Sequence, residues 1–478
     1  MKIKSIKIKN HKILGNLNLD FTDNNGNIYD TIIFIGENGC GKTTILNFLS
    51  TIFDYKQNVK EDIDNSYKYT VTILLSNDEL KNINNAISID NIIMKKTSPI
   101  NNEIEITYNP ISNNNVNLQY SFLNTPQDNS YSLLTKLQKY CVSIYATAQI
   151  NLNSRSVDSV KASNIDCKID KSIKATENLG NEIKQLFIDI TANDANDLLY
   201  WVYNNPGLPP NEEIIYPRIK RFNNAFSDIF SNQLSFDRVE TVNNKKEVYF
   251  KNHGIDVKID DLSSGEKQLI YRGAFLLKDK SSLHNALVLI DEPEISMHPK
   301  WQLNILNYYK NLFKDNNDKQ LSQIFLTSHS EYLFKGKTKT DLVYILTKKN
   351  NNIVVKKCEE QNILPFNNFA ENKYFAFDIP TLEFFNELYA YIGWKTSMRF
   401  DDYIMSIKAN LLAKYTRYYQ LIQWQKDNGK TIYITPITYI RHEIHHPENC
   451  LNNKIYKNDN DLREPIEFML YLIKTFNI

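Results

Sequence analysis

A short glycine-rich segment near the N-terminus combines the side chains and the spacing that a polyphosphate site requires. Residues 36–44 read G-E-N-G-C-G-K-T-T, which fits the pattern G-x-x-x-x-G-K-[S/T] between an apolar strand and a helix. Glycines let backbone N–H groups wrap around phosphate oxygens, and the helix start adds the positive end of its dipole. We therefore expect Lys42 to reach the β- and γ-phosphates of ATP and the Thr43 hydroxyl to bind Mg²⁺. The predicted nucleotide-binding residues of this P-loop are Gly36, Asn38, Gly39, Gly41, Lys42, Thr43 and Thr44; the alternative is a glycine-rich turn without a ligand.

Two acidic residues follow a second apolar strand. Residues 286–293 read A-L-V-L-I-D-E-P, so the apolar run ends at Asp291 and Glu292. This order is typical of a Walker B element, in which Asp291 holds Mg²⁺ through water and Glu292 orients and activates the attacking water. The alternative is a strand that ends in an acidic turn, but the P-loop earlier in the chain favours the catalytic interpretation.

A third segment, residues 262–268, reads L-S-S-G-E-K-Q and opens a predicted helix over 265–278. Small side chains and free N–H groups at a helix start can bind an anion, so we expect Ser263, Ser264 and Gly265 to contact nucleotide. An ordinary helix N-cap is the alternative. The segment resembles the L-S-x-G-x-x-Q signature of ATP-binding-cassette (ABC) ATPases.

Taken together, these segments resemble the RecF/SMC-like branch of the ABC ATPases over roughly residues 1–357. In that family the signature of one subunit closes on the P-loop nucleotide of another. The resemblance therefore implies a head-to-tail homodimer around two ATP molecules, each with Mg²⁺. It further implies that His329, which follows the apolar strand 323–327, is the switch histidine at the γ-phosphate, and that Gln149, after the strand 142–146, belongs to the Q-loop. Residues 294–302 resemble the D-loop region of RecF-like and OLD-like proteins.

A cluster of histidines lies near the C-terminus, in a predicted helix over 434–446. There, the sequence R-H-E-I-H-H at residues 441–446 contains two overlapping motifs. Arg441, His442 and His446 fit the R-[N/H]-x-x-x-H pattern of HEPN-domain ribonucleases, which are small helical bundles that dimerise across a cleft. By this resemblance, His446 is a general acid or base and Arg441 stabilises the phosphate charge. His442 positions or polarises groups at the site, and Glu383 completes it. Such a site needs no metal, because the ribose 2′-OH supplies the nucleophile.

Two alternatives for this helix stay open. In the first, His442 and His446 bind zinc with Glu443 as base, in an H-E-x-x-H motif that takes Glu464 or Glu467 as third ligand. Pro447 stops the helix immediately after this motif. In the second, the helix is structural or belongs to a degenerate nuclease, and its histidines lie near the C-terminal end of the helix because they interact favourably with the negative end of the helix dipole.

The strands and helices that the sequence predicts around these residues indicate an α/β fold. It consists of an ABC-type ATPase domain (1–357) with a helical insertion at about 150–231, a linker (358–374), and an all-helical, HEPN-like domain (375–478). Strands are predicted at 31–35, 68–76, 91–97, 103–108, 142–146, 233–241, 246–251, 254–259, 286–290, 323–327, 341–346 and 352–357, after two strands within 1–21. Helices are predicted at 42–53, within 175–231 except for a loop at 204–210, at 265–278, up to 314, from 381, and at 402–425, 434–446 and 461–476.

Overall composition excludes some classes of protein. The chain has 478 residues and a net charge of +1, so any nucleic-acid binding has to come from local patches. Five scattered cysteines, without metal or disulfide spacing, fit a reducing cytosol and predict a cytoplasmic protein. No apolar run approaches membrane-spanning length, so we expect no membrane partner.

The domain order resembles bacterial antiphage ATPases, and three hypotheses follow from it. In the first, as in anticodon nucleases, an ATPase dimer gates RNA cleavage, with tRNA as substrate, by its own C-terminal domain. In the second, as in Septu-type and retron-associated systems, the ATPase controls a separately encoded HNH nuclease, and its partners include a retron reverse transcriptase with its msDNA. In the third, the chain is a RecF-like DNA-repair ATPase that acts on DNA.

Overall fold

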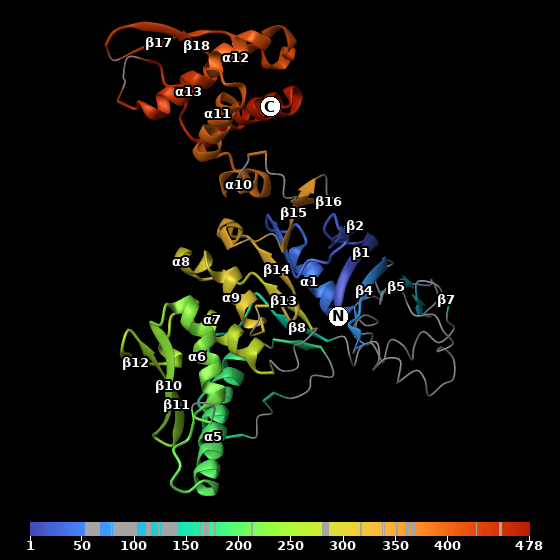
Figure 1. Cartoon of the computed structure of the whole chain (residues 1–478), viewed down its shortest axis with the longest axis vertical. Coiled ribbons are helices and arrows are strands. Elements are labelled where there is room, and N and C mark those ends of the chain that lie inside the picture. Colours follow the sequence, from blue (N-terminus) through green and yellow to red (C-terminus); the bar gives the residue numbers. More distant parts are fainter. Residues whose placement is uncertain are drawn as a thin grey trace. The chain divides into compact units, whose positions relative to one another are not determined.

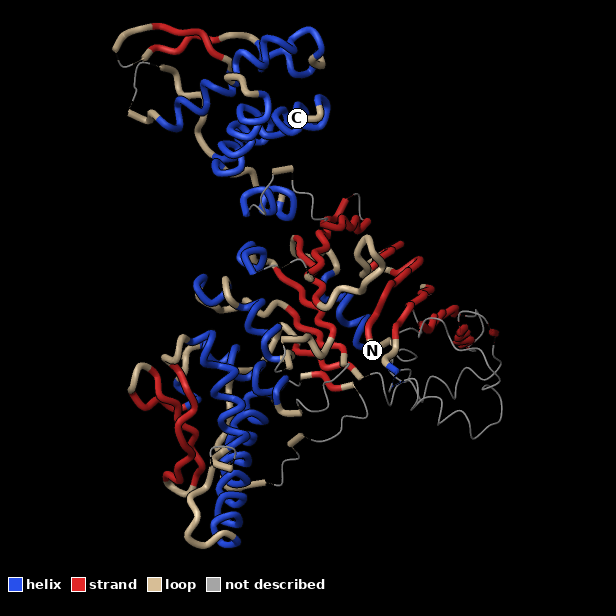
Figure 2. Tube along the Cα trace, viewed as in Figure 1, coloured by secondary structure: helices blue, strands red, loops and turns tan. Residues whose placement is uncertain are grey.

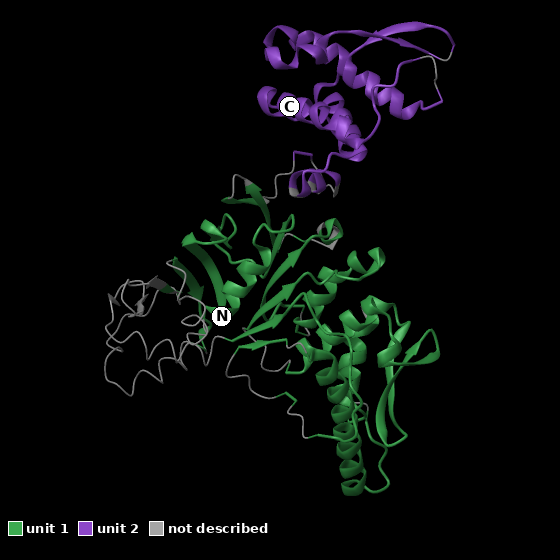
Figure 3. Cartoon of the chain, turned by 180° about the vertical axis from the view of Figure 1, so that it is seen from behind, with its two compact units in different colours: residues 1–358 green, residues 359–478 purple. Residues whose placement is uncertain are grey.

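The computed structural model divides the chain into two compact units, unit 1 (Met1–Cys358) and unit 2 (Glu359–Ile478) (Figure 3). Among the described residues, no helix is long and apolar enough to cross a membrane. The structure describes residues 1–52, 67–77, 79, 103–110, 116–122, 125–126, 142–161, 165–166, 172–175, 178–211, 214–279, 286–315, 318–336, 338, 340–349, 352–358, 363–364, 369–426, 428–448 and 452–478.

Seven of the described strands of unit 1 form one sheet, which is parallel except at its β15–β16 edge. Its central strands are fully buried, because both faces of the sheet are covered and β-branched residues fill them. The P-loop strand β3 lies next to β14. Strand β14 lies next to β13, as Figure 1 shows. The strands in order across the sheet are β16 (Asn352–Cys358), β15 (Asp341–Lys349), β3 (Thr31–Gly36), β14 (Gln323–Ser328), β13 (Leu287–Asp291), β8 (Ser143–Ala146) and β9 (Ile173–Lys174).

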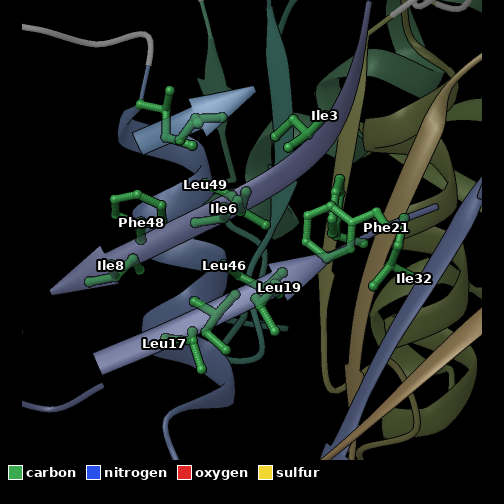
Figure 4. Close-up of a cluster of buried hydrophobic side chains, with 14 of the residues drawn as sticks. Ile3, Ile6, Ile8, Leu17, Leu19, Phe21, Ile32, Leu46, Phe48 and Leu49 are labelled. Atoms are coloured by element: carbon green, nitrogen blue, oxygen red, sulfur yellow. The ribbon is translucent and has the colours of Figure 1, made fainter. Parts of the chain in front are cut away.

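A second, antiparallel sheet covers the other side of the P-loop helix α1 (Lys42–Thr51). Figure 4 shows apolar side chains of β1 and β2 directed toward Leu46, Phe48 and Leu49 of α1. This cluster continues into β3, β13 and β14, so α1 is held between the two sheets by apolar burial. The strands of the second sheet are β2 (Gly15–Asp20), β1 (Lys2–His11), β4 (Lys68–Leu74), β5 (Glu103–Pro110), β6 (Val116–Phe122) and β7 (Thr125–Pro126).

A helical insertion with its own small sheet follows β9. The long helix α5 (Leu179–Asn204) and helix α6 (Pro217–Phe230) are separated by the loop that the Asn and Pro residues of 204–210 predict. We call α5 and α6 the arm; Figure 1 shows it beside the three-stranded sheet. That sheet consists of β10 (Leu234–Val242), β11 (Lys245–Asn252) and β12 (Ile255–Lys258), and the helices that follow it are α7 (Ser264–Leu277), α8 (Pro299–Gln302) and α9 (Ile305–Leu312).

Unit 2 is mainly helical and has its own apolar core. Figure 2 shows helices with one pair of strands in this unit. Thr381 and Thr435 cap two of the helices with their side chains, and Pro436 occupies the first turn after Thr435. Its elements are α10 (Phe369–Phe377), α11 (Leu382–Thr396), α12 (Phe400–Ile407), β17 (Ile422–Gln425), β18 (Thr431–Ile434), α13 (Pro436–His445) and α14 (Arg463–Phe476).

Most of the predicted elements are found in the structure within a few residues, but two predictions differ. The helix predicted over 402–425 ends at Ile407, and residues 422–425 form the strand β17 instead. Unit 2 is therefore not entirely helical. Helix α10 begins within the range 358–374 that was predicted as a linker. The strand predicted at 91–97 lies outside the described residues.

Candidate functional site

The P-loop joins β3 to α1 in a conformation that requires glycine at defined positions. Gly36 has φ of +156°, and a side-chain Cβ there would lie 2.1 Å from the carbonyl oxygen of Leu346 on β15. Gly41, the N-cap of α1, has φ of +86°, in the left-handed region that other residues rarely adopt. Close packing against β15 and a left-handed helix start therefore fix the course of this loop.

Lys42 occupies the inside of the P-loop. Its Nζ donates hydrogen bonds to the carbonyl oxygens of Gly36 and Glu37, both at 2.9 Å. Burial lowers the pKa of Lys42, although nearby carboxylates, including Glu292, act in the opposite direction. The loop thus encloses a buried ammonium group, which is the group that a polyphosphate site needs.

Two side-chain oxygens meet where α1 begins and β13 ends. The Thr43 hydroxyl donates to Asp291 Oδ1 at 3.1 Å, and the hydroxyl of Thr327 donates to the same oxygen at 2.5 Å. The register of β13 and β14 pairs Asp291 with Thr327, which explains the second contact. A hydroxyl and a carboxylate with a phosphate and waters are the oxygen ligands that Mg²⁺ prefers, so Thr43 and Asp291 could hold this ion.

Glu292 and the ring of His329 form the next part of the site. His329 Nε2 lies 2.8 Å from Glu292 Oε1, and its Nδ1 lies 3.3 Å from Lys42 Nζ. Because an ammonium group can only donate, Nδ1 accepts from Lys42 and Nε2 carries the proton that bonds Glu292. Glu292 itself has φ of +43°, and its backbone N–H donates to the Thr327 carbonyl oxygen at 3.2 Å. The structure therefore links Lys42, His329 and Glu292 in one chain of contacts.

Glu294, which the sequence analysis placed in a D-loop-like segment without a role, holds the loop that carries His329. Its Oε1 accepts from the hydroxyl of Ser328 at 2.7 Å, from the backbone N–H of His329 at 2.6 Å and from that of Ser330 at 3.1 Å. Burial raises the pKa of Glu294. The only signal for this role in the sequence was the position of Glu294, two residues after Glu292. Its hydrogen bonds form only after β14 has folded beside β13, so the sequence alone did not indicate them.

The structure does not bring the signature or Gln149 to the P-loop of the same chain. Among the described residues, no hydrogen bond or ion pair links Ser263, Ser264 or Gly265 to the P-loop. Ser263 forms a capping box with Glu266 at the start of α7, as the N-cap interpretation predicts. The side chain of Gln149 is exposed after β8.

With this geometry in view, comparison with known proteins identifies the family. Residues 32–335, more than half of the chain, match the family described as "AAA domain, putative AbiEii toxin, Type IV TA system". The chain belongs to this family. The matched range contains both the P-loop and the Walker B residues of this AAA-type ATPase domain.

Solved structures of SMC heads also resemble the chain, and no curated protein sequence matches it. An SMC head bound to the C-terminal winged-helix domain of ScpA has a TM-score of 0.41 and 12% identity, over 75% of this chain and 99% of that one. The SMC head domain from Thermotoga maritima has a TM-score of 0.39 and 15% identity, over 75% of this chain and 100% of that one.

The second predicted site lies in unit 2, beyond the residues that match the AbiEii-type ATPase family. On α13, the guanidinium carbon of Arg441 lies 4.7 Å from the ring centre of Tyr389 on α11. The ring of His442 stacks on Trp424 of β17 at 5.4 Å, and the ring of His446 lies 6.0 Å beyond His442. Arg441 and His442 are therefore packed against neighbouring elements, while His446 ends the helix.

His442 and His446 differ in their surroundings. Burial lowers the pKa of His442, and the nearby charges of His446, Arg441 and Lys426 lower it further, whereas Asp401 raises it. The side chain of His446 is 49% exposed, and its Nδ1 lies 3.3 Å from Glu448. His446 also lines a pocket of about 340 Å³ whose wall includes Leu382, Trp424, Glu443, Ile444, Pro447, Asn452, Asn453, Lys454, Tyr456 and Lys457.

The zinc alternative does not fit this geometry. Glu443 Oε2 accepts hydrogen bonds from the backbone N–H groups of Ile455 and Tyr456, both at 3.0 Å, so this carboxylate anchors a loop. Glu464, one of the two proposed third ligands, pairs with Arg417. In the parts of the chain that the structure describes, no group of three or more His, Cys, Asp or Glu side chains could hold a metal ion.

Two residues of α11 that face the motif were missed by the sequence analysis. Asn386 Oδ1 lies 3.3 Å from His445 Nε2, and Tyr389 stacks under Arg441. Glu383, the acid selected on this helix, is exposed one turn before Asn386. The three-residue spacing of these positions places them on one helix face, which is a signal that the sequence contained.

Proposed function

We propose that this protein is a cytoplasmic antiphage ATPase whose nucleotide site gates RNA cleavage by its own C-terminal unit. Family membership supports the ATPase part. The observation that carries the nuclease part is the difference between two motif histidines, His442 on α13 and His446 at its C-terminal end. His442 is packed on Trp424 with a lowered pKa, and His446 is exposed beside a pocket with two lysines.

In the proposed ATPase reaction, Lys42 binds the β- and γ-phosphates of ATP, and Thr43 and Asp291 would hold Mg²⁺, which when bound would neutralise phosphate charge. Glu292 takes a proton from the water that attacks the γ-phosphorus, the bond from that phosphorus to the β,γ-bridging oxygen breaks, and ADP leaves with that oxygen. His329 holds Glu292 through its Nε2 proton. Ser263–Gly265 of a second copy complete the site, because the signature of the same chain lies apart from the P-loop contacts. The functional unit is then a homodimer with two shared ATP molecules.

In the proposed nuclease reaction, His446 takes the proton of a ribose 2′-OH, and the 2′-oxygen attacks the adjacent phosphorus. The P–O5′ bond breaks, so the products are a 2′,3′-cyclic phosphate and a 5′-hydroxyl. The leaving oxygen takes its proton from the protonated His446 of a second copy. Arg441 stabilises the negative charge on the phosphate oxygens. The neutral ring of His442 positions the helix end by stacking on Trp424.

The test uses the full chain, with His446→Ala as the inactive variant and His253→Ala as the matched control. His253 is exposed between β11 and β12, outside both sites. Purified wild type and His253→Ala should cut tRNA in the presence of ATP and leave 2′,3′-cyclic phosphate ends, whereas His446→Ala should leave tRNA intact. Equal cleavage by His446→Ala, or none by the wild type with phage lysate added, contradicts the nuclease proposal.

A second candidate function is that of an ATPase that controls a separately encoded HNH nuclease, together with a retron reverse transcriptase and msDNA. It is favoured by large apolar side chains on the surface of unit 2, which a bound protein would cover. These exposed residues include Trp394 (66% exposed), Tyr433 (65%), Leu412 (49%) and Leu421 (47%). Toxicity that appears only when an adjacent HNH gene is co-expressed, and that survives His446→Ala, supports this function over the first.

A further inference from the structure

Arg272 of α7 is a fully buried arginine whose guanidinium group donates hydrogen bonds to four backbone carbonyl oxygens of unit 1. Nη1 donates to the carbonyl oxygens of Asp291 at 3.0 Å and Glu292 at 3.1 Å. Nη2 donates to those of Thr147 and Ala148, both at 2.9 Å. One side chain of the signature helix therefore joins the Walker B end to the loop after β8.

These carbonyls lie where the ladder between two neighbouring strands stops. Strands β8 and β13 pair in parallel up to Ala146 and Ile290, and Arg272 bonds the next residues on both strands. A guanidinium group presents several N–H donors in a fixed plane, which lets it hold four carbonyls at once. An ammonium group in the same place has three donors on a flexible stem and cannot reproduce this geometry.

The backbone that Arg272 holds is the backbone that sets the direction of Glu292. Glu292 has a positive φ of +43°, a conformation that costs free energy for a residue other than glycine unless its neighbours fix it. Arg272 fixes its carbonyl group, and Thr327 fixes its N–H group. The groups that could bind nucleotide, Lys42 and Thr43, have no hydrogen bond with Arg272 among the described contacts.

The loop that Arg272 holds continues into the base of the arm. A Cβ on Gly180, at the start of α5, would lie 2.7 Å from the carbonyl oxygen of Asn153. The backbone N–H of Arg155 donates to the side chain of Asn181 in the same turn. The start of α5 therefore packs directly on the segment that continues the loop held by Arg272.

We propose that Arg272 is a positioning residue for ATP hydrolysis, which couples the signature helix and the base of the arm to the alignment of Glu292. Closure of a partner on the signature helix would then adjust the hydrolytic step without changing the P-loop contacts. This inference depends on ATP hydrolysis at the P-loop site and is independent of RNA cleavage by unit 2.

The test measures ATP hydrolysis and ATP affinity separately in the full chain carrying Arg272→Lys. Because Arg272 acts on Glu292, kcat should fall at least about tenfold, which corresponds to ~1.4 kcal/mol, while the Kd for ATP stays within about twofold. Arg221→Lys is the matched control, since Arg221 is a largely buried arginine of the arm that pairs with Asp166 outside the nucleotide site, and its substitution should leave both values unchanged.

A second variant separates positioning from general stability. Arg272→Ala should bind ATP but hydrolyse it slowly, and added guanidinium at millimolar concentration should restore part of kcat, whereas methylammonium should not. Unchanged kcat in Arg272→Lys overturns the proposal. So does a parallel loss of ATP binding, hydrolysis and melting temperature that guanidinium does not reverse, because that pattern belongs to a purely structural side chain.

Discussion

The P-loop site of unit 1 and the histidine helix of unit 2 were both predicted from short motifs, but the structure supports them differently. In unit 1, residues from three separate segments converge, and hydrogen bonds join Lys42, His329 and Glu292 directly. In unit 2, the motif residues come from the single helix α13, and each contacts a different neighbour.

This difference shows what convergence adds to a motif. Segments that are distant in sequence meet in unit 1 only because the register of β3, β14 and β13 aligns their carboxyl ends. A chance arrangement of that kind is improbable, so the geometry is evidence for chemistry. His442 and His446 are four residues apart and lie near each other in any helix, so their contact alone indicates no chemistry. The evidence for a function of α13 is therefore the lowered pKa of His442 and the pocket beside His446.

The largest expected effect is a loss of ATP hydrolysis without a loss of ATP binding in unit 1. Glu292→Gln keeps an oxygen that can accept the Nε2 proton of His329 but loses the base, so kcat for ATP hydrolysis should fall by about 100-fold or more while ATP still binds. Rapid-quench hydrolysis and nucleotide binding measure the two effects. Glu240→Gln, at an exposed position of β10, is the control.

The same variant also tests the shared site. Trapped ATP should produce a dimer in size-exclusion chromatography coupled to light scattering. If Glu292→Gln binds ATP and remains monomeric, the two-copy arrangement is wrong, although the roles of Lys42 and Glu292 within one chain would stand.

The next effect concerns ATP affinity. Lys42→Met removes a buried ammonium group whose charge-assisted bonds to phosphate are worth ~2–3 kcal/mol, so ATP should bind at least about 30-fold more weakly. Isothermal titration calorimetry measures this loss, with the exposed Lys9→Met on β1 as control. Affinity within a factor of about two of the wild type would mean that the P-loop does not hold the nucleotide.

Much of unit 1 could be predicted because its signals are local. An apolar run followed by a glycine-rich turn predicts β3 and α1, and an apolar run followed by two acids predicts β13. The contacts of Arg272 and Glu294 could not be predicted, because most of their partners are backbone groups that any sequence provides.

The hairpin of unit 2 shows a local signal that the sequence analysis missed. Residues 422–425 and 431–434 alternate apolar and polar side chains around an Asn428-Gly429 turn, which is a hairpin pattern, but the preceding helix was extended through it. The stacking of Trp424 on His442 follows from this hairpin, so that contact could not be foreseen once the hairpin was missed.

A smaller effect distinguishes a structural from a metal-binding carboxylate on α13. Glu443→Gln weakens two hydrogen bonds to backbone N–H groups and should cost about 1–2 kcal/mol of unfolding free energy, or roughly 3–6 °C in melting temperature. Glu448→Gln, at an exposed position, should change little. A zinc chelator such as phenanthroline should leave the wild-type melting temperature unchanged, and a clear drop would restore the zinc hypothesis.

The smallest effect is a pH dependence that belongs to His442. Burial lowers its pKa from 6.5 in the folded chain, so the unfolded chain binds more protons below that pH, and stability falls as the pH drops from 6.5 toward the folded pKa. His442→Phe keeps a ring on Trp424 but cannot titrate. When the pH is lowered from 7.5 to 5.5, the calorimetric melting temperature of unit 2 should fall by about 1–2 °C less in His442→Phe than in the wild type. The control His253→Phe, in unit 1, should show the same fall in the unit 2 melting temperature as the wild type. An equal fall in all three proteins would show that burial does not lower the pKa of His442, and the proposed difference between His442 and His446 would then be wrong.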